Sequence, residues 1–165
     1  FCAQPWDPTA PPSALAHVIA RRVTHLDPET AMFAGIVHEV GGFYLISRAK
    51  DFPGLLVGEP GDWAESAEAE IGRAILTRLV VPDAVMQAIE AQWDGYLALP
   101  PVTLGDTLLL ANELAPVTSP LYELGIVRNG GAAPIIDSVI DEQTLSSILT
   151  ESSAEVESLT AALRF

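Results

Sequence analysis

Apolar residues recur every three or four positions along most of this chain, which is the spacing of one face of an α-helix. The clearest example near the start is the set Leu15, Val18, Ile19, Val23 and Leu26. Few segments alternate apolar and polar residues with the period of two that indicates a strand. The pattern therefore predicts an all-α protein, built as an irregular bundle of several short helices joined at proline and glycine breaks.

Capping residues and breaks set the expected limits of these helices. Ser13 is the expected N-cap of a first helix, and Asp27 followed by proline opens a second helix that stops at Gly41-Gly42. A short helix then covers residues 43–50. Later helices are expected from Asp62 to about Leu79, from Pro82-Asp83 to about residue 93, from the cap Thr103 to Leu114, from Asp141, and from Ser152 or Ser153 to the end, the last amphipathic through Val156, Leu159 and Leu163.

The chain has 165 residues, a length typical of one domain with a substantial core. Residues 1–12 are rich in proline and are expected to form an extended lead-in. Residues 13–165 are expected to form a single helical domain. Because the first residue is Phe1 rather than methionine, we expect that the lead-in belongs to a missing or trimmed N-terminal part.

The charge balance is strongly acidic, with a formal net charge of -14 and a pI of about 4.3. Such an excess repels phosphates and anionic lipid surfaces, so no nucleic acid and no membrane is expected as a partner. No apolar run looks long enough to span a bilayer, and no secretory signal is visible. A single cysteine, Cys2, fits a reducing compartment, and the expected localisation is cytoplasmic.

Candidate chemistry centres on the stretch from Phe33 to Gly42, where His38 and Glu39 lie side by side before two glycines. Glycine permits a backbone bend or a close approach between helices, so both side chains could turn toward one point. The stretch is either the remains of a metal site or a polar knot inside a helical core.

The expected partner of this pair is His17, on the preceding helix. Helices joined by a short turn are antiparallel neighbours. His17 lies about ten residues before the turn and His38 about ten residues after it, so the two imidazoles are expected at a similar height. His25, next to the turn, is expected to be solvated.

Several segments, taken in order, resemble the HDOD domain, a non-enzymatic relative of the HD metal-dependent phosphohydrolases. Its pattern begins with a segment of the form G-L-L-H-D-I-G, continues with E-x-x-H-A-E-x-G-x-x-L-L and a later L-P, and ends with a helix of the form L-A-D-x-L-A. The matching segments here are Gly35–Gly41, Glu68–Leu76 with Val81-Pro82, and Leu109–Ala115. The resemblance covers about residues 13–125.

The chain departs from the family pattern at most ligand positions. Glu39 replaces the aspartate of the His-Asp pair, Asn112 replaces the late aspartate, and Glu68 replaces a downstream histidine. Gln92 and Trp93 occupy the place of paired histidines. Two-metal hydrolysis needs both ion positions filled. The resemblance therefore leaves His17, His38, Glu39 and Asn112 as weak candidates for binding one divalent metal, with no catalytic residue and no cofactor expected.

The favoured interpretation is a bacterial signal-transduction module that regulates a protein partner without catalysis. In that interpretation His17 joins Glu39 or Asn112 in a polar network that satisfies buried groups. One alternative is a metal-dependent phosphohydrolase with an altered ligand set. Another is a sensor of a small, nucleotide-like ligand. The acidic residues Glu65 and Glu68 are expected on a solvated helix face, and Trp63 and Trp93 in the core or lining a groove.

Overall fold

The computed structural model describes residues 11–52, 60–95, 97–115 and 140–163, without the side chains of residues 60–67, 142, 159–160 and 162–163. Its elements are α1 (Pro12–Ile19), the π-helix η1 (Ala20–Thr24), α2 (Pro28–Val37), α3 (Val40–Ala49), α4 (Pro60–Arg78), α5 (Asp83–Asp94), α6 (Leu104–Leu114) and α9 (Glu142–Leu163). Over these ranges the chain is helical and contains no strand, which confirms the all-α prediction.

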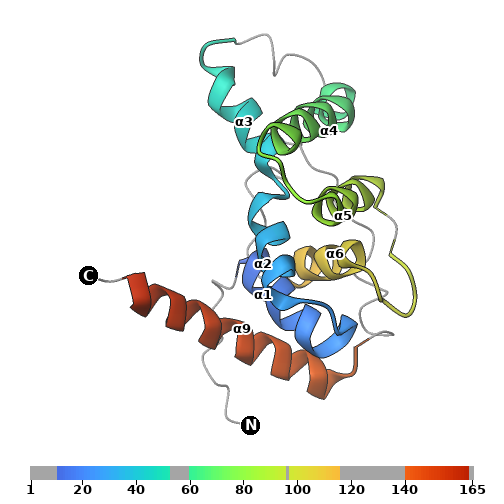
Figure 1. The fold of residues 1–165 in the computed structure, drawn as a ribbon, viewed down its shortest axis with the longest axis vertical. Coiled ribbons are helices and arrows are strands. Elements are labelled where there is room, and N and C mark those ends of the chain that lie inside the picture. The colour runs from blue at the N-terminus through green and yellow to red at the C-terminus, as the bar shows by residue number, and fades with distance from the viewer. Residues whose placement is uncertain (1–10, 53–59, 96, 116–139, 164–165) are drawn as a thin grey trace.

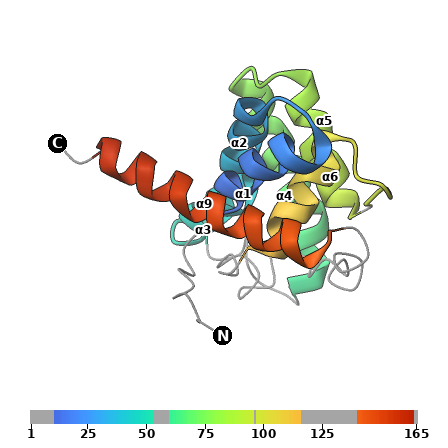
Figure 2. The same ribbon diagram turned by 90° about the horizontal axis from the view of Figure 1, so that it is seen from below.

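The helices follow one another along an elongated body (Figure 1). Helix α1 is central at one end, where it packs on α2, α6 and α9. Helix α3 packs on α4 at the other end, and α5 packs on α6 between them. Seen from below, α9 crosses the base of the body and then extends beyond it (Figure 2). The arrangement brings the α2–α3 junction within reach of α4 and α6, although both follow it in the chain.

The core consists of the apolar faces that the helical spacing predicted. Leu15, Val18 and Ile19 of α1 are fully buried, and Val23 and Leu26 pack against them half-buried. The largest buried side chains from the other helices are Leu45, Leu76, Val85, Ile89, Leu108, Leu110 and Ile148. Burial of apolar area on this scale is the main stabilising term of the fold.

The first helix differs from its prediction at both ends. Ser13 is not the N-cap, because α1 begins at Pro12 with Pro11 in the capping position. The α-helical hydrogen bonding ends at Ile19 and gives way to η1, which His25 terminates in the left-handed conformation at φ 53°. His25 is exposed, as predicted. By contrast, Asp27 caps α2 as expected, since its carboxylate accepts a hydrogen bond from the Thr30 backbone N–H at 2.8 Å.

The predicted stop at Gly41-Gly42 is wrong, because the break comes earlier, at His38-Glu39. Helix α2 ends at Val37, and Glu39 adopts φ -98° and ψ 10° before α3 begins at Val40. Both glycines are buried inside α3. A Cβ added at Gly41 would lie 2.5 Å from the Glu68 carbonyl oxygen and 2.9 Å from the Gly72 backbone. Gly41 therefore serves the close crossing of α3 and α4 rather than a turn.

Two other predicted boundaries are also wrong. Helix α4 begins at Pro60 rather than at Asp62. The end of the chain forms one helix, α9, rather than two: Asp141 caps it by accepting from the Thr144 N–H. The hydroxyls of Ser152 and Ser153 donate to the Leu149 carbonyl oxygen, so these serines bond within the helix instead of starting a new one. Predictions that fall on residues 1–10 and 116–139 lie outside the described residues.

Helices α2 and α3 contradict the expectation that no apolar run is long enough to span a bilayer. The stretch Pro28–Ala49 is 22 residues long and, among the described residues, is apolar enough by length and composition to cross a membrane. Its middle carries the buried His38, and its small residues pack against other helices of the body. The core helix of a soluble protein passes the same test of length and composition, and 39% of the apolar window is buried inside the body.

A cluster of ion pairs holds α9 against η1. Arg21 and Arg22 of η1 both pair with Glu151, Arg21 through a hydrogen bond of 2.8 Å. The hydrogen bond from Arg22 lowers the pKa of the Glu151 carboxyl, and Arg21 acts in the same direction. Next to this cluster, the buried side chains of Ile148 and Ser152 face the body. The first half of α9 is therefore anchored.

Candidate functional site

The imidazole of His38 is the centre of the candidate site. It lies at the break between α2 and α3 and is only 5% exposed. Its Nδ1 lies 2.8 Å from the Gly35 carbonyl oxygen, one turn earlier in α2. Its Nε2 lies 3.1 Å from Oδ1 of Asn112, which α6 brings across from 74 residues further along the chain. Both ring nitrogens are therefore engaged by the protein.

These two contacts bear on which nitrogen of the ring carries a hydrogen. A carbonyl oxygen only accepts, so Nδ1–H of His38 donates to Gly35. In a neutral ring Nε2 then carries the lone pair, and the Asn112 amide must be turned over from the placement with Oδ1 toward the ring so that its nitrogen donates. In an imidazolium, Nε2–H donates to Oδ1 instead. In both states the Asn112 amide occupies the direction in which Nε2 would bind a metal.

Two carboxyl groups lie beside this imidazole. Glu39 Oε1 lies 3.9 Å from His38 Nε2, beyond hydrogen-bonding distance, and the Glu39 side chain is mostly buried. Glu68 of α4 is 7% exposed. Burial raises the pKa of Glu68 to about 7, and the negative charge of Glu39 acts in the same direction. The site is thus a buried polar cluster of His38, Asn112, Glu39 and Glu68, contributed by the α2–α3 junction, α4 and α6.

The raised pKa of Glu68 makes folding stability depend on pH. Since this pKa is about 7 in the folded protein and 4.5 in an unperturbed chain, the folded state holds the proton more tightly. The stability linked to Glu68 is fully present below pH 4.5 and is lost as the pH rises to 7. We expect Glu68→Gln to stabilise the protein by about 2 kcal/mol at pH 8 and to have little effect near pH 4.5. Urea unfolding at a series of pH values measures the difference.

The control for this prediction is Glu70→Gln, which removes an exposed carboxylate from the same helix. Its unfolding free energy should follow that of the parent chain at every pH. If Glu68→Gln and Glu70→Gln gave the same pH profile, the buried charge of Glu68 would not be the cause.

His17 does not join the cluster, which corrects the expected meeting of His17 and His38. A Cβ on Gly35 would lie 2.7 Å from the Ser13 Cα, so these residues mark where α1 and α2 cross. In antiparallel helices His17 and His38 lie on opposite sides of that crossing, roughly 10 Å apart along the axes at 1.5 Å per residue. His17 instead faces Glu29, with Nδ1 4.0 Å from Oε1. The short turn was predicted correctly, but the crossing point was not.

The donor set does not fit the divalent metal considered from the sequence. His17 is separated from His38 and Glu39, and the amide of Asn112 engages His38 Nε2. Within the described ranges, no group of three or more His, Cys, Asp or Glu side chains is placed to hold a metal ion. A metal at His38 would need the Asn112 amide to move away and Glu39 to approach.

The sequence interpretation placed Glu68 on a solvated face, and this was wrong. Among the described side chains of α4, Glu68 lies on the buried face together with Gly72 and Leu76, at a spacing of four. That spacing was the available signal, because an acidic residue in register with buried positions is rarely solvated. Glu65, its proposed companion, lies outside the described side chains, as does Trp63.

Trp93 of α5 packs at the α3–α4 crossing, and Gln92 precedes it in the same helix. The Trp93 indole packs over Gly72, where an added Cβ would lie 2.8 Å from the ring, and the Arg73 guanidinium lies 5.6 Å from the ring centroid. Trp93 is half-buried, in agreement with the expected packing role. The Gln92 Oε1 atom is buried and has no hydrogen-bond partner among the described residues.

No family model, no curated protein and no solved structure matches this chain. The resemblance of Gly35–Gly41 and Glu68–Leu76 to the HDOD pattern therefore stays a hypothesis. Any assignment of function rests on the chemistry of the cluster around His38.

Proposed function

We propose that this protein is a non-catalytic regulatory module of a cytoplasmic signalling pathway, of the HDOD type, which acts by binding a protein partner. The observation that carries the proposal is the engagement of His38 by Gly35 and Asn112. A hydrolytic centre of the related enzymes needs imidazoles free to bind ions that activate water. Here the central imidazole serves as a structural link between α2 and α6.

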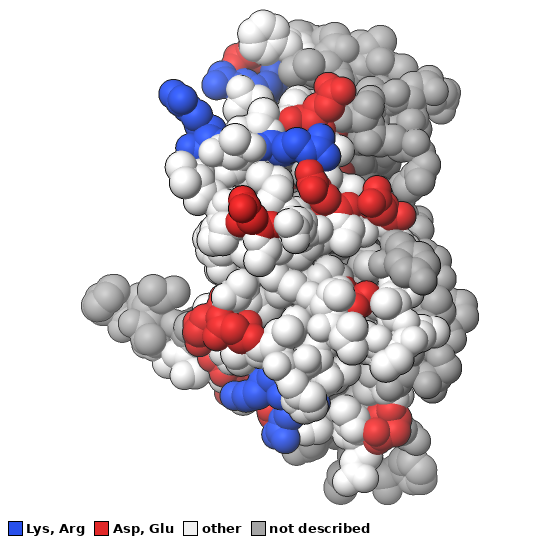
Figure 3. Space-filling model, turned by 45° about the vertical axis from the view of Figure 1, so that its right-hand side comes forward, with Lys and Arg blue, Asp and Glu red and all other residues white. Residues whose placement is uncertain are grey.

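The surface charge supports a protein partner rather than a nucleic acid. On the face drawn in Figure 3, basic side chains lie beside acidic ones and no broad basic patch gathers. Arg21, Arg22, Arg48 and Arg73 each pair with a carboxylate of the same chain. Binding to a phosphate backbone requires clusters of uncompensated lysine and arginine.

Metal content and phosphoesterase activity test the proposal directly. The purified protein, incubated with Mn²⁺, Mg²⁺, Fe²⁺ or Zn²⁺ and desalted, is expected to hold substoichiometric metal and to show no turnover of a generic phosphodiester. Asn112→Asp, which restores the carboxylate of the family pattern beside His38, is expected to bind a divalent ion at least about tenfold more tightly than the parent chain. Elemental analysis and calorimetric titration provide both readings.

The matched controls are His38→Ala and His25→Ala, which remove a buried and an exposed imidazole. Ion binding by Asn112→Asp should disappear when His38→Ala is added and persist when His25→Ala is added. Stoichiometric metal in the parent chain, lost together with phosphodiester hydrolysis on His38→Ala, would overturn the proposal in favour of the phosphohydrolase.

A small nucleotide-like ligand is the second candidate, favoured by the buried side-chain Oε1 of Gln92, which no described residue satisfies. A thermal-shift screen against nucleotides and cyclic dinucleotides tests it. A shift that survives His17→Ala but is lost in Gln92→Leu would support a sensor that uses this oxygen. The absence of any shift at millimolar nucleotide would leave the protein partner as the sole function proposed.

A further inference from the structure

Helices α2 and α3 expose a row of large apolar side chains to solvent. Phe33, Ile36, Phe43 and Tyr44 are all exposed, and Ile36 is the most exposed of them at 64%. Phe33 and Ile36 lie one turn apart on one side of α2, and Phe43 and Tyr44 lie in the first half of α3, which follows α2 along the body in Figure 1. We call these four residues the α2–α3 stripe. Contiguous exposed apolar rows of this kind mark interaction surfaces.

The end of α9, past the half-buried Glu155 and Val156, extends away from the rest of the described chain. Both ribbon views show it extending beyond the body (Figures 1 and 2). Among the other described helices, α1 packs on α9 and η1 holds it through Arg21 and Arg22, and the anchoring residues Ile148, Glu151 and Ser152 belong to its first half. Isolated helical segments of this length are marginal in water, so an extension of this kind gains stability by packing on a second surface.

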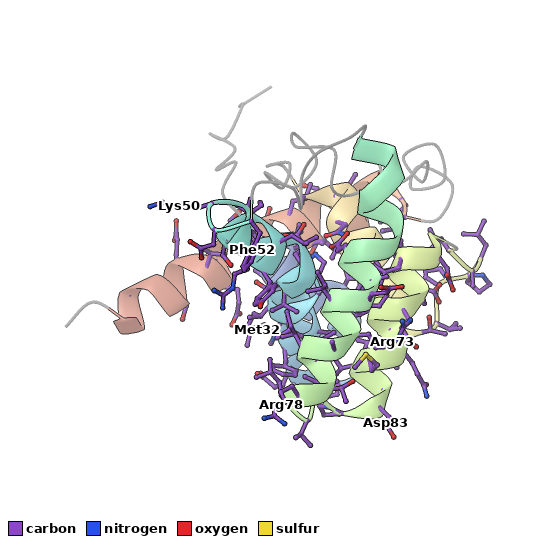
Figure 4. All side chains as sticks on the ribbon, turned by 90° about the horizontal axis from the view of Figure 1, so that it is seen from above. Met32, Lys50, Phe52, Arg73, Arg78 and Asp83 are labelled. Carbon is purple, nitrogen blue, oxygen red and sulfur yellow. The ribbon has the colours of Figure 1, made fainter. Side chains whose placement is uncertain are left out.

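The α9 extension points to the side of the molecule on which Met32, Lys50 and Phe52 lie (Figure 4). Met32 and Phe52 adjoin the stripe in sequence, and Lys50 follows the last turn of α3. The extension therefore leaves the body on the same side as these residues.

The α9 extension and the end of α3 carry side chains of opposite charge. The extension carries Glu155 and Glu157, and Glu157 is exposed. The end of α3 carries Arg48 and Lys50, both exposed, in a chain that has 8 basic and 22 acidic residues. Arg48 pairs with Asp51 of the same chain, so Lys50, for which the described residues supply no ion pair, is the basic side chain beside the apolar row that can meet the acidic extension. Charge complementarity of this kind selects and orients a partner surface.

We propose that the occupant of the α2–α3 stripe is the α9 extension of a second copy of this chain, and that the exchange is reciprocal in a two-fold dimer. Each copy then covers the apolar row of the other, and Glu157 of one copy lies near Lys50 of its partner copy. A closed two-fold arrangement satisfies both unpartnered surfaces at once, which a one-sided contact does not. This assembly is independent of whether the cluster around His38 binds a metal.

Sedimentation velocity of the full chain tests the dimer at concentrations of about 10 to 100 μM, where moderate protein dimers are populated. The parent chain is expected to be dimeric, and Ile36→Glu to be monomeric. The matched control is Leu79→Glu, because Leu79 is also apolar and 60% exposed but lies at the end of α4. Leu79→Glu should remain dimeric. A monomeric parent chain at 100 μM would overturn the proposal.

Charge exchange tests which surfaces meet. Lys50→Glu and Glu157→Lys are each expected to weaken dimerisation about tenfold, since each dimer contains the pair twice, and the double variant should restore it. Mixing Ile36→Glu with Glu157→Lys chains should give a heterodimer held by the one intact pair of surfaces. If Glu157→Lys dimerised like the parent chain, the stripe would meet something other than α9, and the reciprocal exchange would be refuted. Circular dichroism confirms that each variant is folded.

Discussion

Gly41→Ala is expected to lower the free energy of unfolding by about 3 kcal/mol, the cost of overpacking where neither neighbour can yield. The added Cβ would lie 2.5 Å from the Glu68 carbonyl oxygen and 2.9 Å from the Gly72 backbone. Both are backbone groups of α4, so α3 and α4 must separate as rigid elements. Alanine is otherwise favoured over glycine within a helix by about 1 kcal/mol, which makes a net loss informative. Urea unfolding followed by circular dichroism measures it.

Gly95→Ala is the control for this prediction. Gly95 has open space around its Cβ position but adopts φ +68° at the end of α5. Alanine there suffers only backbone strain, so we expect a loss of about 1 kcal/mol. A Gly41→Ala protein as stable as the parent chain would mean that α3 and α4 do not cross as closely as described.

Gly41→Ala should also change the candidate site. Helix α4 carries Glu68 toward Glu39 at this crossing, so separating the helices should weaken the repulsion between the two carboxylates and admit water to Glu68. Since burial is the main cause of the raised pKa of Glu68, that pKa should fall toward its ordinary value. The pH dependence described for Glu68 should therefore be reduced in Gly41→Ala.

Local signals in the sequence predicted much of the fold because they act over a few residues. Asp27 and Thr103 cap the helices that they were expected to cap, through side chains that accept backbone N–H groups three residues on. The apolar spacing of Leu15, Val18 and Ile19 likewise marked the buried face of α1. Such features depend on helix geometry alone.

The candidate site was harder to predict because it depends on where helices cross. Spacing along the chain suggested that His17 and His38 would meet, whereas the close contact of Ser13 with Gly35 sets the register between their helices. The link between His38 and Asn112 spans 74 residues and was foreseen only as one option, with His17 in the place of His38. Burial of Glu68 follows from the crossing at Gly41, and neither glycine nor glutamate indicates by itself which helix it will meet.

Asp106→Ala should destabilise the protein by about 3 kcal/mol, because one buried carboxylate holds together the loop before α6 and the start of that helix. Asp106 accepts hydrogen bonds from the backbone N–H groups of Ala98, Val102 and Thr103 at 2.8–3.0 Å, and from the Thr103 hydroxyl at 2.7 Å. Thr103 in return accepts from the Asp106 N–H, which completes a capping box. Alanine would leave these partly buried donors without their acceptor.

The pH dependence identifies the charged form of Asp106 as the stabilising one. Burial alone would raise the pKa of Asp106, but the hydrogen bonds from Thr103, Ala98 and Val102 outweigh it and lower that pKa below 3.8. Its contribution is therefore present above pH 3.8 and is lost as the pH falls through the lowered pKa. The deficit of Asp106→Ala should shrink in strong acid, while Asp83→Ala, which removes an exposed carboxylate at the start of α5, should show no comparable deficit at any pH. If the loss of unfolding free energy in Asp106→Ala did not change with acid, it would come from packing rather than from these hydrogen bonds. The hydrogen bonds between Asp106 and the loop would then not contribute to holding α6, and with it Asn112, in place beside His38.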